Sequence, residues 1–372
     1  MRITDIDDES REFNKTSLTS PDTNLDYADN YLLKQGDILF ARTGASVGKT
    51  YQYKESDGKV YYAGFLIRAR ILSGFNPGFV FQNTLTKRYE NFISVTSQRS
   101  GQPGINAQEY ASFNLLLPKF EEQEQIADLF IRLDNLITLH QRKHDALKSM
   151  KKTMLSKMFP KNGEDVPEIR FKGFTDAWEQ RKFMECINNI VDYRGKTPKK
   201  LEMNWSPEGY LALSALNVKD GYIDFELDAN YGDIELYNAW MKQDLSKGQV
   251  VFTTEAPMGN VAQIPDDSKY ILSQRVIAFE VADEKITDDF LATLLKSPKV
   301  FDDLTSLATG GTAKGVSQRS LSKLSVKIPQ IIEEQNKIAK IICTLNRSIT
   351  LHQRKLDELK NMKKTLLQQM FV

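Results

Sequence analysis

The first segment with a chemical pattern is a glycine-rich run that resembles a phosphate-binding loop. Residues 44–50 read GASVGKT, which places three residues between Gly44 and Gly48. A loop that cradles nucleotide phosphates needs four residues there and a helix directly after it. Residues 51–53 (YQY) predict a strand instead, and the equivalent turn at residues 256–260 has no lysine. The pattern therefore favours a turn between strands over a nucleotide site.

One acidic pattern is compatible with a metal-dependent nuclease. Asp22 together with residues 57–59 (DGK) would supply two carboxylates and an amine. An Asp-Gly pair is better explained as a hairpin turn, and residues 265–269 (PDDSK) also fit a turn. No set of Ser, His and Asp, or of Cys and His, recurs in both halves of the chain. We therefore expect no catalysis by this chain.

The counts of histidine and cysteine argue against a metal site. The chain has three His and two Cys, and Cys186 and Cys343 lie in unrelated contexts without metal-ligand spacing. They form no disulfide framework, which fits a reducing cytoplasm. The N-terminus has no apolar signal core, and no apolar run of 18 residues exists elsewhere. We expect a cytoplasmic protein that binds neither metal nor cofactor itself.

Basic and amide side chains in turns beside predicted strands are the remaining chemical candidates. Base edges of DNA are read by Arg, Lys, Asn and Gln, and phosphates are bound by Lys, Arg and backbone amides. The candidates in the first half are Arg42, Lys49, Arg99, Gln102 and Asn106. Those in the second half are Arg194, Lys196, Lys199, Lys200, Lys314, Gln318 and Arg319. For each residue the alternative is a solvated surface charge. Residues 273–275 (SQR) are expected nearer the core, with Arg275 as a candidate for a structural ion pair.

The overall charge does not by itself indicate a nucleic-acid partner. The 372 residues include 50 Lys and Arg and 49 Asp and Glu, a formal net charge of +1. Any DNA-binding surface must therefore come from local segregation of charge. The apolar content of 41% is ordinary for a globular protein, and the length suggests two or three domains.

One stretch of sequence occurs twice and organises the chain. Residues 137–143 (ITLHQRK) recur unchanged at 349–355, an offset of 212. At the same offset, the pair at 122–123 (EQ) recurs, and so does the KKT at 151–153. Two copies are too few for a solenoid, so the chain is a tandem duplication.

Each copy predicts one long helix. A proline precedes each, acidic residues fill the first turns and lysine dominates the last turns, as the helix dipole favours. No Pro or Gly interrupts residues 121–158, so roughly 38 residues at ~1.5 Å each make a rod of ~57 Å. Apolar residues recur at spacings of three and four, including Leu129, Met154 and Met158, which is typical of a coiled-coil seam. The acidic front and basic rear favour antiparallel pairing of the two copies.

Antiparallel pairing about a pseudo-twofold axis predicts which residues pack together. The expected packing set is Ile126, Leu133, Ile137, His140, Leu147, Ile338, Leu345, Ile349, His352 and Leu359. His140 and His352 lie near the middle of the two helices, so we expect them side by side as a polar layer that fixes register. The alternative is that both histidines point to solvent.

The segments in front of the two helices are expected to be strand-rich globules. In the first we predict a buried strand at 36–42, a hairpin turn at 56–59 before 60–62, helical character at 82–98 and a strand at 113–117. The duplication extends into both globules: residues 36–40 match 248–252, 104–106 match 315–317, and 113–118 match 324–329. About forty residues at the front of the second globule have no counterpart in the first. Either the first half is truncated or the chain begins upstream of the sequence shown.

The arrangement resembles the DNA-specificity subunit of type I restriction–modification systems. The residues that carry the resemblance are Leu117-Pro118, Glu121-Glu122-Gln123 and Ile126-Ala127, and their repeats Ile328-Pro329, Glu333-Glu334-Gln335 and Ile338-Ala339. Residues 167–179 (PEIRFKGFTDAWE) and 195–198 (GKTP) add to it. The resemblance implies two target-recognition domains that read a split DNA site and two conserved helices that set the unread spacer. The short first globule departs from the family pattern.

We therefore expect an α+β fold with two strand-rich mixed α/β target-recognition domains separated by two long antiparallel coiled-coil helices. The expected domains are 1–117 and 168–328, the helices 118–160 and 329–372, and the linker 161–167. The resemblance implies a non-catalytic subunit that binds double-stranded DNA, methyltransferase (modification) subunits and a restriction/translocase subunit. S-adenosylmethionine, ATP and Mg²⁺ would then bind to those partners. The alternatives are a coiled-coil assembly protein that does not read DNA, and a stand-alone nuclease.

Overall fold

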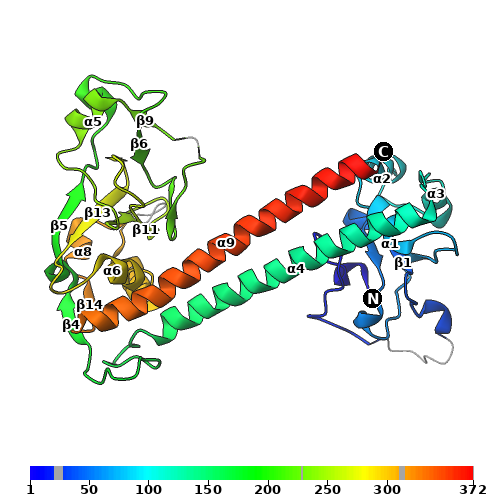
Figure 1. Ribbon diagram of the computed structural model, residues 1–372, viewed down its shortest axis with the longest axis horizontal. Coiled ribbons are helices and arrows are strands. Elements are labelled where there is room, and N and C mark those ends of the chain that lie inside the picture. The colour runs from blue at the N-terminus through cyan, green and yellow to red at the C-terminus, as the bar shows by residue number, and fades with distance from the viewer. Residues whose placement is uncertain (21–27, 228, 310–314, 372) are drawn as a thin grey trace. The chain divides into compact units, whose positions relative to one another are not determined.

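A computed structural model describes residues 1–20, 28–227, 229–309 and 315–371. The chain divides into two compact units (Figure 1). Unit 1 comprises residues 1–143 and 352–372, and unit 2 comprises residues 144–351. Each unit therefore contains a globule and parts of two long helices, and the two units are described separately below.

The two long helices are α4 (Phe120–Lys157) and α9 (Ile332–Met370). Both are continuous, as the absence of Pro and Gly predicts. In unit 1 the first part of α4 packs beside the last part of α9, and in unit 2 the last part of α4 packs beside the first part of α9. The two helices are therefore antiparallel. The predicted fold class, with two mixed α/β modules and two long antiparallel helices, is confirmed.

The helices of unit 1 are held by one apolar cluster that also reaches the globule. It joins α4 to α9 and to the first helix of the globule through Phe79, Ile126, Ala127, Phe130, Leu133, Leu359 and Leu367. The prediction that Leu129 lies in the seam is wrong, because Leu129 is exposed and Phe130 is buried in its place. Burial against the globule as well as against α9 widens the apolar stripe beyond a strict heptad seam.

The globule of unit 1 has a small antiparallel sheet of order β2-β1-β3. Its strands are β1 (Ile38–Ala41), β2 (Thr50–Gln52) and β3 (Leu66–Ala69). Its helices are α1 (Pro77–Asn83), α2 (Lys87–Thr96) and α3 (Ala107–Ala111), with 3₁₀ turns η1 (Ile3–Asp5), η3 (Asp29–Tyr31), η4 (Gly44–Ser46) and η5 (Glu55–Asp57). The predicted buried strand at 36–42 is present as β1, with Leu39 and Ala41 in the core.

Of three local predictions for unit 1, the helical character of residues 82–98 is confirmed and the other two need correction. The helical segment at 82–98 is two helices, α1 and α2, because Thr86 caps a new helix by accepting from the Tyr89 backbone N–H. Residues 60–62 contribute only an isolated bridge from Tyr61 to Leu32, so the turn before them is not a two-stranded hairpin. Residues 113–117 form no strand, since no neighbouring strand lies beside them among the described residues.

Unit 2 contains a larger set of strands. They are β4 (Glu179–Lys182), β5 (Ile187–Asp192), β6 (Tyr210–Leu213), β7 (Val218–Lys219), β8 (Tyr222–Ile223), β9 (Tyr231–Gly232), β10 (Val250–Thr253), β11 (Val261–Gln263), β12 (Ile271–Leu272), β13 (Val276–Val281) and β14 (Ser325–Ile328). The helices are α5 (Ile234–Trp240), α6 (Asp288–Leu294), α7 (Pro298–Leu307) and α8 (Gln318–Leu321), with 3₁₀ turns η6 (Phe183–Cys186) and η7 (Pro198–Leu201). The main sheet has the order β11-β10-β13-β5, and smaller sheets have the orders β12-β6-β9, β14-β4 and β7-β8.

The main sheet of unit 2 is buried on both faces. Successive side chains of a strand point to opposite faces, and here they alternate between two apolar clusters. Val250 and Phe252 of β10 enter the cluster that also contains the long helices, whereas Val251 enters the cluster beneath α5. Strand β13 alternates in the same way. The near-continuous apolar runs of β10 and β13 are explained by this double burial.

The two globules share a framework despite their different sizes. The order β2-β1-β3 in unit 1 corresponds to the order β11-β10-β13 in unit 2, with β1 and β10 central. The sequence match between residues 36–40 and 248–252 therefore marks the same strand in the two copies. This correspondence places the loops that follow β1 and β10 in equivalent positions.

Candidate nucleic-acid interface

The same loop scaffold appears in both units directly after the central strand. In unit 1 the backbone N–H of Ile105 donates to the Arg42 carbonyl at 2.9 Å, and Thr43 bridges to Gly104. In unit 2 the backbone N–H of Val316 donates to the Thr254 carbonyl at 2.9 Å, and Glu255 bridges to Gly315. Each scaffold joins the loop after the central strand to the loop before a short helix.

Most candidates of unit 1 lie around this scaffold. Arg42 is exposed at the end of β1. The Gln102 side chain lies against Gly44, whose positive φ of 75° is a backbone conformation that favours glycine. Asn106 caps α3 by accepting from the Glu109 backbone N–H at 2.9 Å, and Arg99 forms an ion pair with Glu109 at 2.5 Å. Four candidates therefore come together on one group of loops.

The fifth candidate of unit 1, Lys49, is placed differently. Its side chain is buried, and its ammonium donates to the Ile6 carbonyl at 3.0 Å and pairs with Asp8. A buried and paired ammonium stabilises the loop that carries it and is not presented to a ligand. The segment after Gly48 continues as strand β2, so the glycine-rich run is a turn between strands, as its spacing predicts.

The candidates of unit 2 are organised by a carboxylate that the sequence interpretation did not single out. Asp192 at the end of β5 receives the Arg194 guanidinium (Nε at 2.9 Å and Nη2 at 2.5 Å) and the Gln318 amide at 3.0 Å. Although burial opposes the charged form, hydrogen bonds from Arg194 and Gln318 lower the pKa of Asp192. The carboxylate thus ties a loop after β5 to the start of α8.

The lysines of the same loop have two kinds of environment. Lys196 donates to the Trp240 carbonyl at 2.6 Å and lies over the Tyr193 ring at 4.8 Å, and burial together with Lys242 lowers the pKa of Lys196. Lys200 donates to the Gly195 carbonyl at 2.6 Å, so both residues brace the loop. Lys199 on η7 and Arg319 on α8 are exposed. Lys314 lies outside the described residues.

Two further residues join this surface that the sequence interpretation placed nearer the core. Gln274 is exposed and donates to the Lys196 carbonyl at 3.3 Å. Arg275 pairs with Glu255 at 3.1 Å, which confirms the suggested ion pair, but both side chains are about half exposed. The sequence feature that could have indicated their exposure is a polar Gln-Arg pair between two buried apolar strands, β12 and β13. Arg275 has a φ of 66°, a left-handed conformation that turns the pair outwards.

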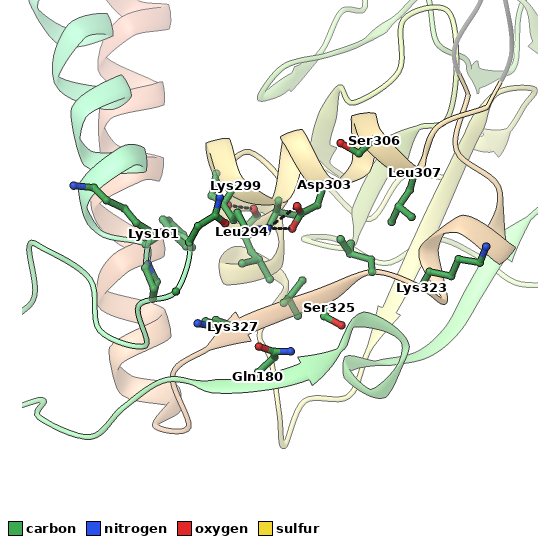
Figure 2. Close-up of a pocket in the computed structure, with 18 residues that line it drawn as sticks. Lys161, Gln180, Leu294, Lys299, Asp303, Ser306, Leu307, Lys323, Ser325 and Lys327 are labelled. Carbon is green, nitrogen blue, oxygen red and sulfur yellow. Dashed lines mark hydrogen bonds and ion pairs between the residues drawn. The ribbon is translucent and has the colours of Figure 1, made fainter.

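A separate cavity of about 450 Å³ lies beside the β14-β4 sheet (Figure 2). Four lysines line it, and three of them are paired: Lys299 with Asp303, Lys327 with Asp165 at 2.6 Å, and Lys161 with Glu168 at 3.0 Å. These internal pairs make the cavity a poorer phosphate site than the exposed loops. Within the described residues, no group of three or more His, Cys, Asp or Glu side chains is placed to hold a metal ion. No described helix is long and apolar enough to cross a membrane.

The ten residues predicted to pack along the long helices are all buried or half-buried. His140 and His352 lie together, with 2.9 Å between their Nδ1 atoms and 5.0 Å between ring centroids. In unit 1 an ion pair from Lys363 to Asp134 at 2.6 Å also joins α9 to α4. That the histidine layer fixes register stays a prediction.

Comparison with known proteins gives a consistent result. The family profile described as "Type I restriction modification DNA specificity domain" matches residues 7–149 and 177–361. The chain is 24% identical over 345 residues to the type I restriction enzyme MjaVIII specificity subunit of Methanocaldococcus jannaschii, which covers 90% of this chain and 78% of that protein. It is 22% identical over 374 residues to the putative MjaX specificity subunit of the same organism, with 98% and 84% covered.

Solved structures show the same fold. The chain resembles the crystal structure of a type I restriction-modification system S subunit from M. genitalium with a TM-score of 0.65 and 14% identity, covering 91% of this chain and 83% of that one. It also resembles a chain from a study of complex assembly and conformational transition of the type I R-M system, with a TM-score of 0.50, 16% identity and coverage of 98% and 89%.

Proposed function

Since this chain belongs to the type I restriction modification DNA specificity family, we propose that it selects the DNA site of a type I restriction–modification complex. The repeated loop scaffold is the observation that carries the proposal. Both units present exposed basic and amide side chains where the loop after the central strand meets a short helix. Side chains of these types supply base and phosphate contacts in protein–DNA interfaces.

The candidates divide between two tasks. In unit 2, Arg194 is held by Asp192, which aims the guanidinium in one direction and suits it to reading a base edge. Lys199 and Arg319 are exposed and suit phosphate contacts, which supply affinity that falls with salt. In unit 1, Arg42, Arg99, Gln102 and Asn106 form the corresponding group.

The duplication supports a split DNA site. Two related modules with different loop residues would read two different short sequences, one in each half of the site. The antiparallel helices α4 and α9 would set the length of the unread spacer, since neither is interrupted by Pro or Gly. Inserting residues into both helices would then lengthen the spacer without changing either half-sequence.

The proposal includes partners for the chemistry. Methyltransferase subunits and a restriction/translocase subunit would act where this non-catalytic chain binds, in the cytoplasm. S-adenosylmethionine, ATP and Mg²⁺ would bind to those subunits. Two of the comparisons support assembly in general. The relatives are specificity subunits of type I restriction enzymes, and a structural neighbour comes from work on the assembly of such a complex.

The direct test is the methylome of a cell that lacks other modification systems and expresses this chain with its neighbouring modification subunit. We expect a split motif with two unlike halves. A split palindrome would mean that two copies of unit 2 act together and that unit 1 does not read DNA. An absence of methylation, with the complex shown to assemble, would contradict the proposal and favour a coiled-coil assembly protein.

Two arginine substitutions test whether DNA binds to the candidate loops or to another part of the surface. Arg319→Ala removes an exposed charge at the candidate surface, whereas Arg347→Ala removes an exposed charge on α9. We expect Arg319→Ala to weaken DNA binding by about tenfold, within the range for one lost contact. Equal effects of the two substitutions would place the DNA elsewhere.

A further inference from the structure

The residue before the strand that neighbours the central strand is held in the same way in the two units. In unit 1 the backbone N–H of Arg42 donates to the Phe65 carbonyl at 3.1 Å. In unit 2 the backbone N–H of Thr254 donates to the Arg275 carbonyl at 2.8 Å. Arg42 and Thr254 follow the central strands β1 and β10 at the offset of the repeat (254 − 42 = 212). Phe65 and Arg275 therefore occupy equivalent positions.

The second residue after the central strand is another equivalent position. Thr43 of unit 1 bridges to Gly104, and Glu255 of unit 2 bridges to Gly315. The offset is again that of the repeat (255 − 43 = 212). In each unit this residue directly follows the one that is bonded to the carbonyl described above. Each loop scaffold therefore carries two neighbouring side-chain positions that can be compared between the units.

In unit 2 the two positions carry an exposed ion pair. Arg275 Nε lies 3.1 Å from Glu255 Oε1, and the two side chains are 52% and 43% exposed. The backbone beneath them is fixed, since the Arg275 carbonyl also accepts from the Thr254 hydroxyl at 3.2 Å. Arg275 has a φ of 66°, a left-handed conformation that costs free energy for a residue other than glycine. An exposed arginine held in that conformation points to a function of its side chain.

A carboxylate is unfavourable on a surface that binds only phosphates. Glu255 would repel the phosphates of DNA, and its pairing with Arg275 cancels a positive charge that would attract them. In the major groove the carboxylate gains a contact only where a base presents an amino group, as cytosine and adenine do. Glu255 also lies near Arg194, whose pKa is raised chiefly by its hydrogen bond to Asp192 and further by the charge of Glu255. Glu255 therefore belongs to the group of side chains at the candidate interface.

The ion pair is complementary to the edge of one particular base pair. In a C·G pair, cytosine presents an amino donor and guanine presents two acceptors in the major groove. The cytosine amino nitrogen and guanine O6 share a Watson–Crick hydrogen bond, so they lie about 2.9 Å apart. The Glu255 acceptor and the Arg275 donor are 3.1 Å apart, which is nearly the same separation. The carboxylate can therefore face the amino donor while the guanidinium faces the guanine acceptors.

In unit 1 the same two positions carry side chains of a different kind. Phe65 is 66% exposed at the position of Arg275, and Thr43 is half-buried at the position of Glu255. An exposed phenylalanine ring is unfavourable in water, and burying it against an apolar group is favourable. Among the bases, thymine presents such a group, its methyl, in the major groove, and a threonine hydroxyl can bond to either base of the pair. The unit 1 pair therefore suits a T·A base pair.

We propose that the two positions form a base-reading pair in each unit. Glu255 and Arg275 of unit 2 read a C·G base pair in the major groove, the carboxylate at cytosine and the guanidinium at guanine. Thr43 and Phe65 of unit 1 read a T·A base pair through the thymine methyl group. This inference rests on the proposed function, because it names one base pair in each half of the split site. The alternative role for the ion pair is to brace the loop, which would not distinguish one base pair from another.

The first test compares methylomes of cells that lack other modification systems and express this chain, or a variant, with its neighbouring modification subunit. We expect Glu255→Ala to make one C·G position degenerate in one half of the motif. Phe65→Ser should make one T·A position degenerate in the other half. The matched controls are Glu284→Ala and Leu72→Ser, two exposed residues that lie beyond the opposite ends of β13 and β3. Both controls should leave the motif unchanged.

The second test measures DNA binding by the purified complex with duplexes that carry each of the four base pairs at the affected position. The complex with the natural chain should prefer C·G by about 5-fold to 150-fold, the range for one pair of base contacts. Glu255→Ala should reduce this preference to less than about threefold. Arg275→Ala is the second variant and should relax the same position, because both side chains read one base pair. Circular dichroism confirms that each variant is folded.

Several outcomes would overturn the inference. A motif unchanged by Glu255→Ala would do so, as would an equal loss of affinity for all four base pairs, which is the result expected of a brace. Relaxation at an A·T position would overturn the C·G assignment, and relaxation of different positions by Glu255→Ala and Arg275→Ala would overturn the pairing of the two residues. A motif unchanged by Phe65→Ser would overturn the assignment for unit 1. If the assembled complex with the natural chain gave no motif, the proposed function itself would fail, and that failure is distinct from a motif that the variants leave intact.

Discussion

His140 and His352, identical residues of the two repeats, meet with their Nδ1 atoms 2.9 Å apart. At that distance one ring donates and the other accepts, so at least one of the two Nδ1 atoms must lack a proton. The pKa of His140 is lowered, chiefly by burial and then by the nearby charges of His352, Lys143 and Lys355. The contact therefore belongs to the state in which the pair is not doubly protonated.

The histidine pair predicts a pH dependence of stability. Because its folded pKa is below the ordinary value of about 6.5, His140 contributes stability above that pH and loses it as the pH falls towards the folded pKa. The free energy of unfolding should therefore fall more steeply between pH 7.5 and 5.5 in the natural chain than in His140→Gln/His352→Gln. Thermal unfolding at each pH measures this, and both proteins retain His144. Parallel curves would contradict the prediction.

The helix pairing predicts different costs for two leucines of α4. Leu133 is 5% exposed in the cluster between α4 and α9, whereas Leu139 is 46% exposed. Leu133→Ala should reduce the free energy of unfolding by about 2–5 kcal/mol, the usual cost of truncating a buried leucine. Leu139→Ala should cost less than about 1 kcal/mol. Chemical denaturation of both variants measures the loss in free energy of unfolding. Similar losses for the two variants would rule out the packing of Leu133 between α4 and α9.

Both predictions show what the repeat alone could establish. The identity of residues 137–143 and 349–355, with the charge order of each copy, was enough to predict two antiparallel helices and the meeting of the two histidines. The position of Leu129 was not predictable, because the apolar stripe is shared with α1 of the globule and not only with α9. Local pattern also predicted a strand at 113–117, but a strand exists only where a neighbour supplies hydrogen bonds.

The candidate nucleic-acid interface shows the same limit of prediction from local sequence pattern. Residue type and turn context predicted Arg194 and Gln318 separately, at positions 124 residues apart (318 − 194 = 124). Their meeting at Asp192 depends on the pairing of β5 with β13 and on the loop before α8, which no local pattern specifies. Lys49 had a favourable context, but the fold buries its ammonium against Ile6 and Asp8. Tertiary contacts therefore decide which candidate side chains remain available.

An ion cluster in unit 2 predicts a large effect from one carboxylate. Asp220 receives the ammonium groups of Lys296 at 2.9 Å and Lys151 at 3.2 Å, and so joins α4 to the turn between β7 and β8. Lys296 is nearly buried, and burial lowers its pKa. Asp220→Asn should cost about 1–2 kcal/mol, less than for a fully buried pair because Asp220 is partly exposed. Asp267→Asn, an exposed turn residue, is the control, and equal stability of the two variants would contradict this role.

A half-buried acid in α6, Asp288, predicts a variant that is more stable than the natural protein. Burial raises the pKa of Asp288 to about 6, and its Oδ1 has no hydrogen-bond partner in the described structure. The folded state therefore binds the proton of the Asp288 carboxyl more tightly than the unfolded state does. Protonation of Asp288 thus stabilises the folded protein at low pH, and this stabilisation is lost as the pH rises through about 6. Asp288→Asn should therefore raise the free energy of unfolding by about 1–2 kcal/mol at pH 8, allowing for partial exposure, and by little at pH 4. Urea denaturation at both pH values tests this against the exposed control Asp302→Asn, and a gain that is the same at pH 4 and pH 8 would exclude titration of Asp288 as the cause.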